Sequence, residues 1–197
     1  MKTLTLFPTV INISKNPNHN QIEKLLVDEC ISVQETTSQG GKNWYSDVYN
    51  TCGTHNLMDN VKFKSLNDWI ISEVQQYANM IGYNQKPFKT KVSGWFNIYD
   101  KHDYQEVHDH IDYSDISIIY YLTAPEGTGN VIFYSPEPKG VKSVFDKDNP
   151  YTYSTMSIQP EAGTLVMFKS NVKHGVQQNK TNKQKISLAY NFEILWH

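Results

Sequence analysis

The chain has 197 residues, of which 18 are Lys or Arg, 20 are Asp or Glu and 13% are aromatic. This length suits one domain with a sizeable core, so we expect a single domain over residues 1–197. A net charge of −2 argues against the basic surface that binds nucleic acid or membranes. No apolar run approaches the roughly 20 residues of a membrane span, so neither nucleic acid nor a membrane is an expected partner.

The first third of the chain predicts one strand and one helix. The segment TLTLFPTVINI is strand-like, and a helix is expected at about 20–33 because apolar residues recur there at helical spacing. Asn20 and Glu23 have the spacing of a capping box. Cys30 falls on the apolar face of this helix.

A second helix is predicted at about 65–81, after a polar and turn-rich loop over 34–60. Its apolar residues also recur at helical spacing, which is typical of packing against a core. Ser65 is expected to cap the start of this helix, and Gly82 is expected to end it.

From residue 88 onward the pattern changes to short strands separated by Gly, Pro, Asn and Asp. Eight strands without an intervening helix are typical of an antiparallel barrel or a double-sheet jelly roll. We therefore predict an α+β fold, mainly β, with a barrel core at about 88–193 and both helices packed on one sheet. The eight segments are FKTKVSGWFNIYD, QEVHDH, ISIIYYLT, NVIFYS, YSTMSIQP, TLVMFK, HGVQQ and KISLAYNFEIL.

The two cysteines and the opening residues indicate in which cellular compartment the protein is expected. Cys30 and Cys52 do not form a Cys-x-x-Cys pair, so we expect two free thiols in a reducing environment. The opening residues MKTLTLFPTVINIS hold one Lys, an early Pro and only short apolar stretches, which is not typical of a secretory signal. These features predict a soluble, cytoplasmic protein.

His108, His110 and Asp112 alternate in the segment HDHID, and along an extended chain alternate side chains point the same way. His174 follows a strong later strand and is the candidate to complete the site from the other side. Two imidazoles and a carboxylate suit non-haem Fe(II), and zinc accepts similar ligands. An exposed loop that happens to carry two histidines is the alternative.

The remaining histidines lack partners at useful spacing, and we expect them to be solvated: His19, His55, His102 and His197. The long polar segment 135–154 is either a substrate lid near the site or a plain exposed hairpin loop. Trp95, Tyr120 and Tyr121 either line a pocket or pack in the core.

Lys185 and Ser187 alternate on the last predicted strand and therefore share a face. A cation at this position could hold the far carboxylate of a 2-oxo acid by a charge-assisted hydrogen bond. The alternative is an exposed polar strand edge.

Several segments together resemble the 2-oxoglutarate and Fe(II)-dependent oxygenases, and are most similar to an oxygenase family found in bacteria and marine phages. They are HDH, SIIYYL, GTGNVIFYSP, EAGTLVMFKSNVKHGVQQN and QKISLAYNF, in that order over about 94–193. NIYDKHDYQEVHDH is also similar to prolyl 4-hydroxylases. The resemblance implies a double-stranded β-helix, Fe(II), 2-oxoglutarate as cosubstrate, ascorbate as an auxiliary reductant, and a bacterial or phage-encoded cytoplasmic enzyme.

The resemblance also assigns residues. His108 falls on the first metal ligand, and His110 falls where prolyl 4-hydroxylases carry Asp. Tyr99 and Ser117 fall on residues that contact 2-oxoglutarate, and Lys185 takes the place of the basic residue that binds it, with Ser187 beside it. Two ligand sets stay open, namely His110, Asp112 and His174, or His108, His110 and His174.

The expected reaction is hydroxylation of a small molecule or peptide, with release of succinate and CO2. A metal-binding cupin-like protein without activity would need the histidines but not Lys185 and Ser187. A structural jelly-roll protein would need neither. Halogenation is a lesser alternative, because a ligand set without a carboxylate could leave room for a halide. Substrate identity and oligomeric state are not readable from the sequence.

Overall fold

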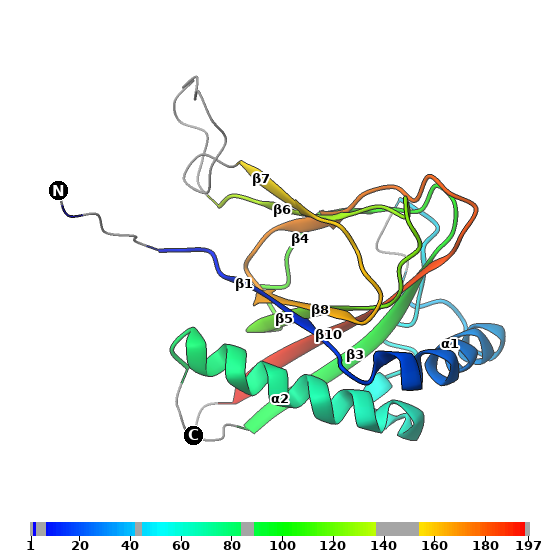
Figure 1. Ribbon diagram of the computed structural model, residues 1–197, viewed down its shortest axis with the longest axis horizontal. Coiled ribbons are helices and arrows are strands. Elements are labelled where there is room, and N and C mark those ends of the chain that lie inside the picture. The colour runs from blue at the N-terminus through cyan, green and yellow to red at the C-terminus, as the bar shows by residue number, and fades with distance from the viewer. Residues whose placement is uncertain (1, 3–6, 42–44, 84–88, 137–153, 196–197) are drawn as a thin grey trace.

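A computed structural model describes residues 2, 7–41, 45–83, 89–136 and 154–195. Its strands form two antiparallel sheets that face each other (Figure 1). The six-stranded sheet has the order β1-β8-β5-β10-β3-β2, and the four-stranded sheet has the order β4-β9-β6-β7. The strands are β1 Ile11–Lys15, β2 Tyr49–Asn50, β3 Lys89–Tyr99, β4 Gln105–His108, β5 Ile116–Thr123, β6 Val131–Tyr134, β7 Thr155–Ile158, β8 Thr164–Lys169, β9 His174–Val176 and β10 Lys185–Leu195.

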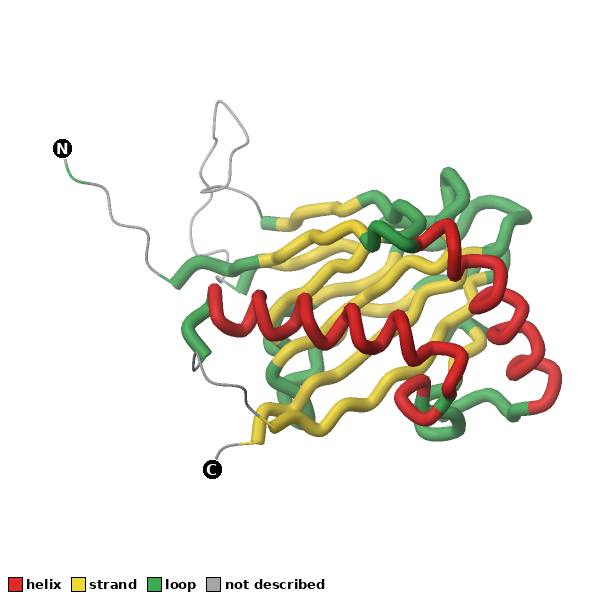
Figure 2. Tube along the Cα trace, turned by 60° about the horizontal axis from the view of Figure 1, so that its bottom comes forward, coloured by secondary structure: helices red, strands yellow, loops and turns green. Residues whose placement is uncertain are grey.

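The helices lie on the outer face of the six-stranded sheet, as Figure 2 shows. They are α1 His19–Thr36 and α2 Lys64–Met80, and two short 3-10 turns, η1 Leu57–Asp59 and η2 Val61–Phe63, lead into α2. The prediction of two helices followed by eight strands is therefore confirmed. None of the helices in the described part of the chain is long and apolar enough to cross a membrane.

Alternation along β10 assigns its two faces to two different environments. Leu188, Tyr190 and Phe192 are buried in the core between the sheet and the helices. Lys185, Ser187 and Asn191, which alternate with them, line a cavity between the two sheets. The strand is buried on both faces, so its apolar residues support the helix layer while its polar residues point inward.

The helix boundaries differ from the predicted caps. The helix α1 begins at His19, so Asn20 lies inside it, and the residue at its N-cap makes no side-chain capping hydrogen bond. Likewise, α2 follows directly from η2, which places Ser65 within the helix. Both predicted caps are wrong because the preceding turns, and not a capping side chain, set where each helix starts. Gly82 does end α2, with a φ of +93° that suits glycine.

His19 is buried, so the prediction that it is solvated is wrong. Its Nδ1 atom lies 2.8 Å from the Tyr120 hydroxyl, and Gly163 packs against its ring with a φ of +78°. A Cβ at Gly163 would lie 2.7 Å from the imidazole Cγ, so the close approach needs glycine. His102 is exposed as expected, and Cys30 and Cys52 are both free thiols. His197 and residues 137–153 of the predicted lid lie outside the described residues.

Candidate active site

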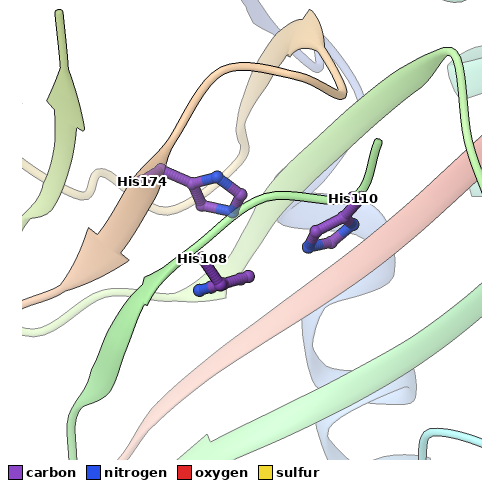
Figure 3. Close-up of side chains that lie close together, drawn as sticks. All are labelled: His108, His110 and His174. Carbon is purple, nitrogen blue, oxygen red and sulfur yellow. The ribbon is translucent and has the colours of Figure 1, made fainter. Parts of the chain in front are cut away.

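Three histidines, two on strands and one in the loop that follows β4, meet between the sheets (Figure 3). His108 ends β4 and His174 begins β9, and the two are direct partners across the antiparallel pair. His110 lies two residues beyond the end of β4, where its backbone N–H donates to the Ser170 carbonyl at 2.8 Å. One ring nitrogen of each histidine lies within 4.8 Å of those of the other two.

Hydrogen bonds fix the same tautomer on all three rings. The Nδ1 atom of His108 lies 2.7 Å from the Glu106 carbonyl, and that of His174 lies 3.0 Å from the Val172 carbonyl. The Nδ1 atom of His110 lies 2.7 Å from the Asn191 side-chain oxygen. Because these oxygens only accept, each Nδ1 carries the proton and each Nε2 carries the lone pair. Three lone pairs in one cluster are the donor set of a metal site.

The environment keeps these imidazoles neutral. Burial lowers the pKa of His108 to about 4 and that of His174 to about 3, and the neighbouring histidines lower both further. Burial also lowers the pKa of His110, against the opposing effect of Asn191. Neutral imidazole is the form that binds a metal, so the cluster is ready for a cation at neutral pH without releasing protons.

Asp112 stays outside this cluster. Its side chain is exposed in the turn after His110, and the group that could hold a metal among the described residues contains the three histidines alone. The reason is that β4 ends at His108, so the alternation that would aim Asp112 inward does not continue. Of the two predicted ligand sets, the geometry brings together the all-imidazole one.

The cluster lies beside a cavity of about 540 Å³ between the sheets. Its walls carry inward-facing residues of β3, β5 and β10 in register. Tyr99 lies opposite Lys185, Asn97 opposite Ser187, and Ser93 opposite Asn191. Buried Lys185 and Tyr99 close one end, whereas exposed Ser93 marks the other end as the mouth.

Lys185 is a buried cation at the closed end of the cavity, with only 1% of its surface exposed. Its ammonium donates to the Gly129 carbonyl at 3.0 Å and lies 4.3 Å from the centre of the Tyr99 ring. No carboxylate forms an ion pair with it within the described ranges. Burial lowers its pKa to about 7. Since no described carboxylate neutralises this lysine, an anionic ligand could supply the counter-ion.

The other predicted ligand-binding residues divide into two groups. Ser187 interacts with the Tyr99 phenol, whose pKa burial raises, so both belong to the Lys185 end. Ser117 lies at the opposite end of the cavity, because it pairs with Asn191. Asn191 follows Lys185 by six residues on β10, or about 20 Å along an extended strand. Its hydroxyl lies 2.8 Å from that of Ser170 and 3.3 Å from the Asn191 oxygen. The structure therefore does not bring Ser117 to Lys185.

Gln105 and Asn191 line the cavity but were not predicted as site residues, whereas Tyr121 was one of three aromatic residues expected either to line a pocket or to pack in the core. Tyr121 is the partner of Ser187 on β5 and is buried at the Lys185 end. Gln105 accepts a hydrogen bond from the Tyr99 hydroxyl at 2.8 Å. Asn191 orients His110. The signal for Asn191 was its alternation with Lys185 and Ser187 on the last strand, which places all three on one face.

The histidine cluster satisfies the chemical requirements for Fe(II). It offers three neutral imidazole donors whose far nitrogens are held by hydrogen bonds, and imidazole suits iron and zinc alike. A buried cation lies in the same cavity. The arrangement can bind a divalent metal and, close to it, an anion that contacts both the metal and Lys185.

Comparisons with known proteins point to the same chemistry. The family model described as "Putative 2OG-Fe(II) oxygenase" matches residues 93–191, half of the chain. No curated protein matches the sequence.

Solved structures share the fold at low sequence identity. A prolyl-4-hydroxylase from Pseudomonas putida is 15% identical with a TM-score of 0.63, and the match covers 94% of this chain and 93% of that one. A prolyl hydroxylase from Trichoplax adhaerens, in complex with a hypoxia-inducible-factor peptide fragment, is 13% identical with a TM-score of 0.66, covering 92% and 82%. HygX from Streptomyces hygroscopicus, with nickel, 2-oxoglutarate and hygromycin B bound, is 10% identical with a TM-score of 0.59, covering 93% and 82%. The fold of this chain is therefore the double-stranded β-helix of these oxygenases.

Proposed function

Because this chain belongs to the 2OG-Fe(II) oxygenase family, and is thus a 2-oxoglutarate-dependent oxygenase, we propose that it hydroxylates its substrate while 2-oxoglutarate is converted to succinate and CO2. The observation that carries this proposal is the presence, in a single cavity, of three inward-facing imidazole lone pairs and one buried lysine that forms no ion pair with any carboxylate among the described residues. We take residues 1–197 as one oxygenase domain.

The metal ligands in this proposal are His108, His110 and His174. Asp112 is not included, because its exposed side chain lies outside the cluster. Iron bound there would supply the activation of dioxygen, with electrons from 2-oxoglutarate. The protein holds the imidazoles in place through the three Nδ1 protons.

The far carboxylate of 2-oxoglutarate is assigned to Lys185, with Ser187, Tyr99 and Tyr121 around it. The ammonium supplies charge, and the hydroxyl groups supply hydrogen bonds in a buried site where such bonds are strong. Ser117 is assigned a different role, since its hydroxyl contacts Asn191 and Ser170. It supports the residue that orients His110, and it does not contact the cosubstrate.

Hydroxylation is favoured over halogenation by the number of protein ligands. Three imidazoles supply as many donors as two histidines and a carboxylate, so replacing the carboxylate by His110 frees no position for a halide. The substrate class is not decided by the relatives, since one is bound to a peptide fragment and another to hygromycin B. Ascorbate dependence stays a prediction.

Anaerobic titration tests this proposal. Fe(II) and 2-oxoglutarate together should give a weak visible charge-transfer band, which should be absent when either is omitted. Admission of oxygen should then release succinate, slowly without a primary substrate. A protein that binds Fe(II) but gives neither the band nor succinate would contradict the proposed reaction.

A further inference from the structure

Two buried side-chain atoms in the cavity wall have no hydrogen-bond partner among the described residues. They are the Nδ2 donor of Asn50 and the Oδ1 acceptor of Asn97. Both residues line the cavity and each is only 3% exposed. Buried polar groups in folded proteins are nearly always paired, so an unpaired donor and acceptor in a cavity need an external partner.

The two amides lie side by side on neighbouring strands. Asn50 of β2 and Asn97 of β3 are direct partners in the antiparallel register, which places their Cβ atoms about 5 Å apart on one face. The donor and the acceptor can therefore contact the same small group.

The orientation of the Asn50 amide is fixed by its surroundings. Its Oδ1 atom accepts from the Cys52 backbone N–H at 3.1 Å, and Gly40 packs so closely that a Cβ there would lie 2.6 Å from this oxygen. The Gly40 N–H also donates to the Asn50 carbonyl at 2.8 Å. With the oxygen engaged, the Nδ2 group is the part of Asn50 left to bind a ligand.

The proposed cosubstrate cannot satisfy both atoms. Every oxygen of the 2-oxoglutarate dianion is an acceptor, and the molecule carries no N–H or O–H group. It could accept from Asn50, but it offers no hydrogen to the Asn97 oxygen. The donor for Asn97 is therefore either a water molecule or the primary substrate.

We propose that Asn50 and Asn97 recognise an amide group of the primary substrate, whose carbonyl accepts from Asn50 Nδ2 and whose N–H donates to Asn97 Oδ1. This inference rests on the proposed function, since it assigns the primary substrate of that same site. The amide belongs either to a peptide backbone, as a secondary amide, or to a carboxamide side chain, as a primary amide.

The position of the pair suits this role. Trp95 lies two residues before Asn97 on the same face of β3, about 7 Å along the strand, and its indole is stacked 6.2 Å from the His110 ring. An amide held at the pair would place its substituents along Trp95, toward the histidines. β2 is the edge strand of its sheet, and Cys52 next to it is exposed, so a ligand can enter from solvent on this side.

The test uses the full chain loaded with Zn(II) and N-oxalylglycine, which occupy the proposed metal and cosubstrate positions. The ligands are fragments made from small carboxylic acids. Each acid is converted to three derivatives, namely a primary amide, an N-methyl amide and a methyl ester. Dissociation constants come from ligand-observed NMR. The ester keeps the carbonyl acceptor and lacks only the N–H, so the best amides should bind about tenfold or more tightly than their esters. The tighter amide form, N-methyl or primary, identifies a backbone or side-chain source.

Two variants separate the roles of the pair. In Asn97→Leu the acceptor is lost, so amide and ester should bind equally. In Asn50→Asp the donor is replaced by an acceptor, so the amide and the ester should both bind more weakly, while the ratio of their dissociation constants should stay the same. Asn20→Leu, at an exposed position on α1, is the matched control and should change neither the amide nor the ester dissociation constant.

The outcomes distinguish this inference from the function beneath it. Retention of the thermal shift caused by Zn(II) and N-oxalylglycine in each variant shows that the cavity is intact. If that shift is present but amides and esters bind equally, or no fragment binds, the pair is merely hydrated and the inference is overturned while the oxygenase assignment stands. If wild-type protein shows no thermal shift with Zn(II) and N-oxalylglycine, the proposed function fails. The amide and ester dissociation constants are then compared on the protein without metal or N-oxalylglycine.

Discussion

Lys185 and Tyr99 are direct partners across β10 and β3, and the ammonium of the one lies 4.3 Å from the ring centre of the other. Lys185 is nearly fully buried, and its ammonium also donates a hydrogen bond to the Gly129 carbonyl. The aromatic face stabilises the cation in part. Burial still lowers the pKa of Lys185 to about 7. The charged ammonium therefore destabilises the folded, unliganded protein.

The first prediction concerns stability without ligand. Lys185→Met removes the buried charge and keeps much of the side-chain volume, so the unliganded variant should be more stable at pH 7 by a few kcal/mol. Urea unfolding measures this difference. Lys183→Met, at an exposed position nearby, should change stability by less than about 0.5 kcal/mol. A less stable Lys185→Met protein would mean that the ammonium is well solvated or paired.

The second prediction is the pH dependence of that stability. The pKa of Lys185 is lowered from 10.5 in the unfolded chain to about 7 in the folded one. Between these values the unfolded state binds more protons, so the free energy of unfolding should rise with pH, by about 1.4 kcal/mol per unit from this group. Unfolding between about pH 7 and pH 9, below the range where tyrosines ionise, should show this slope in the wild type but not in Lys185→Met.

The third prediction follows for the anionic cosubstrate. Only the protonated ammonium attracts a carboxylate, so above about pH 7 the affinity for N-oxalylglycine should fall by about tenfold per unit. Calorimetry on the Zn(II)-loaded protein measures this and should detect proton uptake. Lys185→Arg stays charged throughout, so its binding should be nearly independent of pH. Equal pH profiles for the two proteins would remove Lys185 from the site.

The strands and the histidine pair were predictable because their signals are local. Eight runs of β-type residues, separated by turn residues, correspond to the eight strands from β3 to β10. His108 and His110 stood out by spacing alone, and a family resemblance linked them to Lys185. The tautomers were not predictable, because they depend on carbonyl groups and on Asn191 from a strand far along the chain.

Three features of the site could not be predicted from the sequence, for physical reasons. Asp112 was expected to point inward, but strand alternation stops at the end of β4. Tyr121 and not Ser117 lies opposite Ser187, because pairing register is a property of two strands together. Asn50 belongs to a strand of two residues, which is too short to have a pattern, so its pairing with Asn97 appears only in three dimensions.

The fourth prediction separates the two ligand sets. His108→Ala, His110→Ala and His174→Ala should each weaken Co(II) or Zn(II) binding by more than about a hundredfold, since even loss of a residue that supports a ligand costs about 10–100-fold. Asp112→Asn should leave the affinity within about twofold, because its side chain is exposed outside the cluster. Competition with a chromogenic chelator measures each constant. A large loss in Asp112→Asn together with a small loss in His108→Ala would favour the carboxylate set.

The fifth prediction concerns Asn191, which touches no proposed ligand atom of the metal. Its oxygen accepts from His110 Nδ1 at 2.7 Å and so keeps the lone pair on Nε2. Asn191→Leu removes the acceptor, leaving the other tautomer available and the ring less well oriented. Metal affinity should then fall by about 10–100-fold. Asn191→Asp keeps an acceptor in place and should restore most of the affinity.

A second readout distinguishes positioning from general damage around Asn191. Nitrogen-15 shifts of the His110 ring report the tautomer directly, and in the metal-free wild type they should show protonated Nδ1. In Asn191→Leu they should show a mixture, while His108 and His174, held by backbone carbonyls, keep their tautomer. If all three rings changed together, the variant would have disturbed the sheet, and Asn191 would be a packing residue. Loss of affinity with an unchanged His110 tautomer would likewise contradict the positioning role, because orientation of this one ring is what the Asn191 side chain is argued to supply.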